Sequence, residues 1–117
     1  MTMTLATDSM KTAMLNAYKN EASWISLHTA DPGSTGASEV TGGTPTYARQ
    51  QTTWGTPASG VMTGTKVSIN VPATTVVAAG VHTAASGGST YRDKLTIPST
   101  TVSANATIDV TPTITIT

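Results

Sequence analysis

Apolar and polar residues alternate along most of the chain after residue 24, which is the pattern of strands with one buried face. The clearest case is residues 66–71, where Val67, Ile69 and Val71 share one face. A second alternating set covers residues 102–110, and Asn105 can mark a turn that divides it into two paired strands. Further strands are predicted at 24–29, 49–53, 60–63, 75–83, 90–96 and 113–117, between turns rich in Gly and Pro.

Helical spacing of apolar residues occurs only near the start of the chain. One helical face carries Met10, Ala13, Met14, Ala17 and Tyr18. We predict a helix over about residues 7–20, capped by Thr7 or Asp8 and ended before Glu21, which falls on the apolar face. A helix this short is marginal alone in water, so it must dock, either on the sheet of its own domain or on a neighbouring subunit.

These elements predict a mainly β fold: a single antiparallel β-sandwich, jelly-roll-like in its non-sequential pairing, with one short N-terminal α-helix. Residues 1–117 are interpreted as one domain, because a chain of 117 residues suits one core. Residues from about 30 to 46 form a loop of Gly, Ser, Thr and Pro that is too long for a tight turn. Loops of this length without secondary structure are typically functional or disordered.

The composition narrows the classes of function. The chain has no Phe and no Cys, and aromatic residues make up 4%, so the core is thin and the isolated monomer is expected to be modestly stable. Six basic residues balance six acidic ones and give no basic face for nucleic acid. We find neither a secretory signal nor a membrane-spanning run. A neutral chain with few charged residues is poorly protected against self-association, which favours a protein that functions within an assembly.

Candidate chemistry is sparse. His28 and His82 are the only histidines, and no cluster of acidic residues or Cys completes a metal site, so no metal and no cofactor are predicted. A hydrogen bond from His28 to a loop at the sheet rim is the favoured interpretation. Carboxylates are scattered, and neither a nucleophile elbow nor a phosphate-binding loop occurs. The sequence therefore predicts a protein that is not an enzyme.

Candidate interface residues gather in and after the long loop. Tyr47 and Arg49 follow it directly, and Tyr, Trp and Arg dominate interface hot spots. The alternative for this pair is an ordinary strand start. Trp24 and Trp54 are interpreted first as core anchors, and the alternative for them is an interface anchor. The full candidate set is Asp31, Pro32, Glu39, Tyr47, Arg49 and Trp54.

One block is more specific than the rest: residues 27–33 read LHTADPG and are followed by a Gly-rich loop to Gly43 and by Tyr47-Ala48-Arg49. With a helix over residues 5–19 before it and a strand over 79–83 with a Gly-Gly turn after it, this order resembles a family of small virion proteins of tailed bacteriophages. The family is common in phages of actinobacteria, and its members are often labelled minor tail, tail-fibre or minor capsid proteins. The resemblance covers most of the chain.

The resemblance implies a structural role in the virion, on the capsid surface or the tail, for a protein made in the host bacterial cytoplasm. The leading hypothesis is a non-enzymatic minor capsid or decoration protein that stabilises the shell. Its expected partners are the major capsid protein, other virion proteins and other copies of itself, without nucleic acid or membrane. The alternative is a minor tail or tail-fibre protein, or a carbohydrate-binding module for the host surface at the tail. Both locations stay open at this point.

Overall fold

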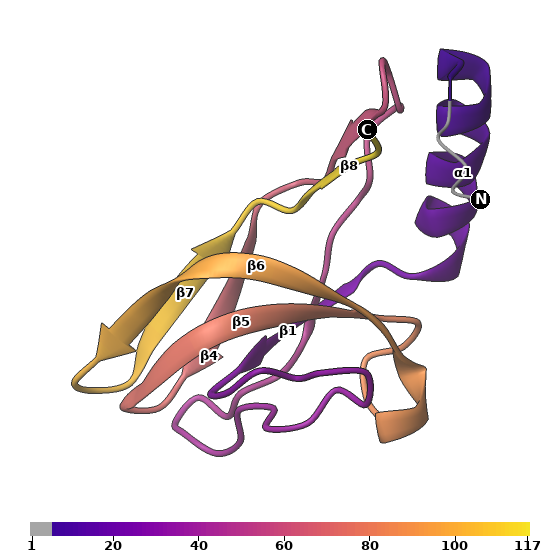
Figure 1. Cartoon of the computed structure of the whole chain (residues 1–117). Coiled ribbons are helices and arrows are strands. Elements are labelled where there is room, and N and C mark those ends of the chain that lie inside the picture. Colours follow the sequence, from indigo (N-terminus) through magenta and orange to yellow (C-terminus); the bar gives the residue numbers. More distant parts are fainter. Residues whose placement is uncertain (1–5) are drawn as a thin grey trace.

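The computed structural model describes residues 6–117; residues 1–5, which include Leu5 of the family resemblance and the start of the predicted domain, lie outside the described residues. The elements in chain order are α1 (Asp8–Glu21), β1 (Trp24–His28), β2 (Gln50–Gln51), β3 (Val61–Thr63), β4 (Val67–Val71), β5 (Thr74–His82), the short 3₁₀ turn η1 (Gly88–Thr90), β6 (Tyr91–Val102), β7 (Ala106–Val110) and β8 (Thr113–Thr115) (Figure 1). The predicted fold class, mainly β with antiparallel pairing and one N-terminal helix, is confirmed.

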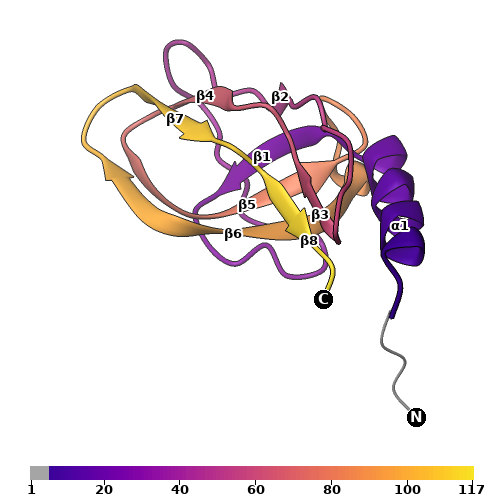
Figure 2. The same ribbon diagram turned by 90° about the horizontal axis from the view of Figure 1, so that it is seen from above.

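The strands form one four-stranded sheet, in the order β2-β1-β5-β6, and two two-stranded sheets, β4–β7 and β3–β8. The β4–β7 pair lies over the larger sheet (Figure 2), and the main hydrophobic core fills the space between them. Val67, Ile69 and Val71 point into this core and are buried, as the alternation predicts. Pairing of β3 with β8 and of β4 with β7 confirms the predicted non-sequential connections.

The second alternating set is divided differently from the prediction. β6 runs on to Val102, and residues 103–105 turn the chain into β7, but β6 pairs with β5 and β7 pairs with β4. The predicted pairing across Asn105 is therefore wrong, because the turn carries the chain from one sheet to the other. β6 tolerates Pro98 because it is an edge strand, where a missing backbone N–H breaks no ladder.

Helix α1 forms where it is predicted, but it presents a different face to the body. Thr7 caps it by accepting a hydrogen bond from the Met10 N–H at 3.3 Å. Leu15 is fully buried, whereas Met10 and Met14 are 52% and 49% exposed. Tyr18 is the one residue of the predicted docking face that packs against the hydrophobic clusters of the body, so the predicted face is wrong for the other four residues. The reason is that the helix touches its own chain along the side of Leu15, and the opposite side faces solvent. The helix therefore includes Glu21 and ends there, one residue later than predicted.

Leu15 belongs to a second, smaller hydrophobic cluster, separate from the core of the sandwich. Its buried members are Leu15, Trp54 and Met62, with Ile114 and Ile116 packed against them. The Trp54 Nε1–H donates to the Ala22 carbonyl at 2.8 Å, so the indole joins the end of α1 to the β3–β8 ribbon. Trp54 is thus a core anchor, while Trp24 is only half-buried. No helix in residues 6–117 is long and apolar enough to cross a membrane.

Candidate interaction site and the polar network beneath it

Two connections meet beside the start of β1. The segment 29–49 leaves β1 after His28, turns, and returns alongside the same strand, where the Val40 N–H donates to the Leu27 carbonyl at 3.0 Å. It arrives at Arg49 next to the turn over residues 83–90 between β5 and β6. This pair of segments includes every candidate interface residue except Trp54.

Under these segments, the outer face of the large sheet is polar. β1 and β5 are antiparallel with Ser26 opposite Gly80, and residues directly opposite share a face. Ser26, His28 and His82 therefore lie on one face and are buried, while Ile25 and Leu27 point into the main core. Gly80 makes room for this polar group: a Cβ there would lie 2.6 Å from Ser26 Oγ. Both faces of β1 are covered, so residues 25–28 are all buried and show no alternation between buried and exposed positions.

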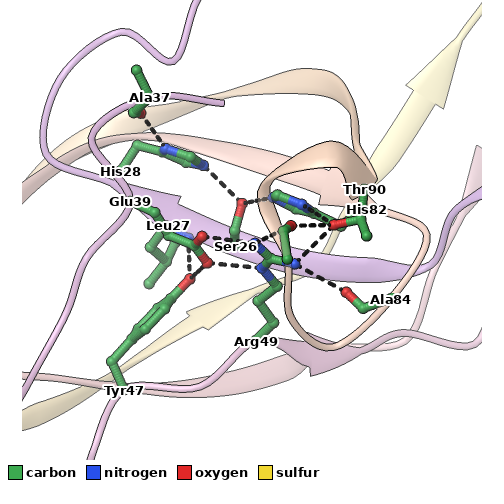
Figure 3. A network of polar contacts seen from close by, with 11 residues as sticks. Ser26, Leu27, His28, Ala37, Glu39, Tyr47, Arg49, His82, Ala84 and Thr90 are labelled. Atoms are coloured by element: carbon green, nitrogen blue, oxygen red, sulfur yellow. Dashed lines mark hydrogen bonds and ion pairs between the residues drawn. The ribbon is translucent and has the colours of Figure 1, made fainter. Parts of the chain in front are cut away.

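The hydroxyl of Ser26 bridges the two histidines (Figure 3). Its Oγ lies 2.8 Å from His28 Nε2 and 2.9 Å from His82 Nε2. The two rings are parallel, with centroids 6.4 Å apart, and Tyr91 contacts both rings edge-on. On its far side, His28 Nδ1 lies 2.7 Å from the Ala37 carbonyl, which confirms the predicted hydrogen bond from His28 to the loop.

The carbonyl at one end of this chain of hydrogen bonds sets its direction. The Ala37 carbonyl only accepts, so His28 Nδ1 carries the hydrogen and His28 Nε2 accepts from Ser26. Ser26 then accepts from His82 Nε2, and His82 Nδ1 lies 3.0 Å from the Thr90 oxygen. The Thr90 hydroxyl donates to the Gly87 carbonyl at 2.6 Å, and its oxygen accepts from Arg49 Nη1 at 3.0 Å. The tautomer of His28 is thus assigned by its partners.

Arg49 ties the two segments together with all five of its N–H donors. Nε and Nη2 donate to the two carboxylate oxygens of Glu39, each at 2.8 Å, in the bidentate geometry that makes such pairs strong. Nη1 donates to Thr90 and to the Ala84 carbonyl, and Nη2 also donates to the Gly87 carbonyl at 3.2 Å. The Arg49 side chain is only 5% exposed.

Tyr47 completes the network. Its hydroxyl donates to Glu39 Oε2 at 2.7 Å and accepts from the Leu27 N–H at 3.1 Å. Glu39 is thus held by both Tyr47 and Arg49, and the returning half of the long loop is fixed to β1 and to the 83–90 turn. No side-chain N or O atom that is buried in residues 6–117 lacks a hydrogen-bond partner.

The ionisation behaviour follows from this burial. Burial, with Arg49 close by, lowers the pKa of His82 from 6.5 to about 4, and burial also lowers the pKa of His28. Burial by itself would raise the pKa of Glu39, but the hydrogen bonds from Arg49 and Tyr47 outweigh it and lower that pKa. Burial and the Glu39 carboxylate raise the pKa of the Tyr47 hydroxyl. The network at neutral pH is therefore one ion pair surrounded by neutral groups.

Above the network, the surface is a shallow depression of about 430 Å³. One wall is residues 40–42 and 46–48, and the other is Ala85, Ser86 and Gly87. The exposed side chains on these walls are small and mostly polar. Ser26 and His28 lie within hydrogen-bonding distance of each other, but Ser26 is fully buried and lines none of the four best-defined surface depressions in residues 6–117. A substrate has no access to its hydroxyl.

The structure brings three of the six candidate residues together and places the others apart. Glu39, Tyr47 and Arg49 form the network, with Arg49 buried rather than presented to a partner. Asp31 is exposed, accepts from the Gly33 N–H and pairs with Lys94 at 3.1 Å. Pro32 is buried, and Trp54 lies in the smaller cluster. A direct interface role for these residues stays a prediction.

Sequence reasoning missed Ser26, His82 and Thr90 as members of the network. The signal available was the spacing Ser26–x–His28, which puts two polar side chains on one face of a strand whose other face is apolar. Asp93 is exposed between Arg92 and Lys94, and it also accepts a hydrogen bond from the Tyr18 hydroxyl at 2.9 Å. That contact joins α1 to β6, elements 75 residues apart in sequence. Pairwise contacts at this separation leave no local pattern in a single sequence.

Comparison with family models gives a match over residues 5–116 to the family described as podophage GP4 fiber I protein gp80. Comparison with curated proteins and with solved structures gave no match. The family match supports the phage virion part of the resemblance noted in the sequence. The description is of a podophage fibre, and it carries neither the actinobacterial attribution nor the capsid role.

Proposed function

The chain belongs to the family of the podophage GP4 fiber I protein gp80 and is thus a structural protein of the phage virion; from this premise we propose that it is a non-enzymatic tail-fibre subunit. This proposal takes the tail alternative from the sequence in place of the leading decoration hypothesis. A role on the shell, with the major capsid protein as partner, has no support from the family description. The proposed partners are other virion proteins and other copies of the chain.

The observation that carries the proposal is the clamping of two surface segments by Arg49. All five donors of Arg49 bind acceptors inside the chain, and Glu39 and Thr90 come from the two different segments. Binding then orders few additional groups, and a surface that is already ordered loses less entropy on association. A protein that functions by binding to other proteins benefits from a surface that is ordered before binding, and it needs no reactive side chain there.

A carbohydrate-binding module at the tail is less favoured. Such a site presents aromatic faces and carboxylates around a groove, and here the Glu39 carboxylate and the Tyr47 hydroxyl beneath the depression are bonded to each other and to Arg49. The exposed wall residues are all small: Thr41, Gly42, Thr46, Ala48, Ala85, Ser86 and Gly87. These small groups suit close contact with another protein surface.

Copy number and location in purified virions test the fibre role. Quantitative mass spectrometry should give a few copies for every hundred of the major capsid protein, and gold-labelled antibody should bind at the tail. Stoichiometric amounts spread over the shell would instead support the decoration hypothesis. Absence from finished particles would refute both.

The role of the depression is tested by bulky charged substitutions in its exposed walls. Thr41→Arg and Ser86→Arg should fold normally, because both side chains are exposed, but should reduce incorporation into particles. Thr101→Arg is the matched control, since Thr101 is an exposed threonine on β6 that lies outside the depression. Equal incorporation of all three variants would exclude the depression as a contact surface.

A further inference from the structure

The outward side of α1 carries apolar side chains that no described residue covers. Met10 and Met14 are about half exposed, and Ala13 and Ala17 are also exposed. In a helix, residues three and four apart share a face, so these four form one stripe. Leu15 points the other way, into the cluster with Trp54. The stripe therefore takes no part in the packing of the helix against its own chain and stays exposed.

The stripe continues into a groove at the C-terminal end of the helix. The groove has a volume of about 420 Å³ and lies between Met14, Ala17, Tyr18 and Ala22 of the helix side and Arg92 and Asp93 of β6. Its polar rim is already paired: Arg92 Nε donates to Glu21 at 2.7 Å, and the Tyr18 hydroxyl donates to Asp93. An apolar floor inside a satisfied polar rim is the arrangement found in protein interfaces.

We propose that the occupant is a second copy of this chain, with the two α1 helices antiparallel about a two-fold axis. Met14 and Ala17 are one turn apart, so an antiparallel pair can set the large Met14 of each copy against the small Ala17 of the other. The same register carries each Met10 one turn further, onto the groove beside Glu21. A parallel pair sets Met14 against Met14 and leaves both grooves empty.

Charge favours the same orientation. In the antiparallel register, Lys11 of one copy lies within one residue of Glu21 of the other, twice by symmetry. Lys11 forms no ion pair among residues 6–117. Glu21 is paired with Arg92, but its side chain is 57% exposed, so its carboxylate can accept Lys11 as a second cation. Antiparallel helices also oppose their macrodipoles, whereas parallel ones align Lys11 with Lys11. This dimer interface goes beyond the proposed fibre role and does not depend on it.

The association is expected to be weak in free solution. Two helices of this length offer less contact than the roughly 1,200 Å² of stable complexes, so we expect a dissociation constant on the order of 100 μM. Sedimentation equilibrium of the full chain should show monomer and dimer. Met14→Glu should weaken dimerisation by at least about tenfold without changing the fold, because the side chain is half exposed. Val77→Glu, at an exposed apolar position on β5, is the matched control and should leave dimerisation unchanged.

Cysteine cross-linking distinguishes the two orientations, and the chain has no native cysteine to interfere. Met14→Cys and Ala17→Cys are purified separately, one carrying a mass tag, then mixed and oxidised. The antiparallel register predicts that the mixed disulfide between the two variants forms faster than the homodimer of either one, and that Ser103→Cys in the β6–β7 turn gives no cross-link. Dominant homodimers of the Met14→Cys variant would overturn the orientation. A chain that stays monomeric to about 1 mM would overturn the interface itself.

Discussion

Mild acid should destabilise the fold through His82. The folded protein holds this imidazole neutral, since burial and the nearby Arg49 lower its pKa to about 4. In the unfolded chain the same group titrates at its ordinary value of 6.5. Between these two values the unfolded state binds a proton that the folded state does not. The stability contributed by neutral His82 is therefore complete above 6.5 and is lost as the pH falls toward 4.

The size of the effect follows from the two pKa values. Each pH unit across the window is worth about 1.4 kcal/mol for one proton, so the free energy of unfolding should fall by about 2 kcal/mol at about pH 5 and about 3 kcal/mol at about pH 4. The lowered pKa of His28 adds to the loss in the same direction. Glu39 has a lowered pKa as well, so its contribution is lost only at still lower pH. Against a typical total of about 5–15 kcal/mol, the loss is large.

Urea unfolding followed by Trp fluorescence, at several values between about pH 7.5 and about pH 5, measures this loss. His82→Gln is the informative variant, because it removes the titrating group. It should be less stable than the wild type near neutrality, yet its stability should vary less with pH. The reasoning is refuted if the wild-type free energy of unfolding is the same at both ends of this range, or if His82→Gln keeps the full pH slope of the wild type.

Three substitutions test the packing. Arg49→Lys should cost about 3 kcal/mol in urea unfolding, because one ammonium cannot replace five directed donors and leaves Glu39 poorly paired; a loss below about 1 kcal/mol would contradict this. Gly80→Ala should cost about 1–3 kcal/mol in thermal melts, because its Cβ meets Ser26, whereas Gly88→Ala, with no atom within 4 Å, should be nearly neutral. Leu15→Ala should lower the melting temperature by the equivalent of about 2–5 kcal/mol, while Met14→Ala stays within about 0.5 kcal/mol; equal effects would contradict the assigned helix face.

The strand pattern was predictable because burial on one face leaves a period of two. β4 shows this with three buried apolar residues between polar ones. The helix was predictable from its cap and spacing, but its buried face was not. Both sides of the helix carry apolar residues: Met10 and Met14 on one side and Leu15 on the other. A single sequence does not show which of these sides packs against the rest of the chain.

The polar network was beyond sequence reasoning for a different physical reason. Arg49 looks like an interface residue because exposed arginines often are, and only the geometry shows that Glu39 and three acceptors of the 83–90 turn surround it. The hydrogen-bonding of His28 to the loop was predictable, since a strand end meets a loop there. On its other side, His28 contacts Ser26, which contacts His82. That contact depends on the register between β1 and β5, and residue types alone do not determine this register.

The two separate hydrophobic clusters give the protein two levels of cooperativity. The sandwich has twelve buried apolar side chains in one continuous core, whereas α1 shares a cluster with only three buried members. The terminal helix therefore opens at a lower free energy than the sandwich, and its amides exchange hydrogen sooner. Local opening of α1 is therefore expected to leave the clamped surface unchanged, because Arg49 and its partners belong to the sandwich.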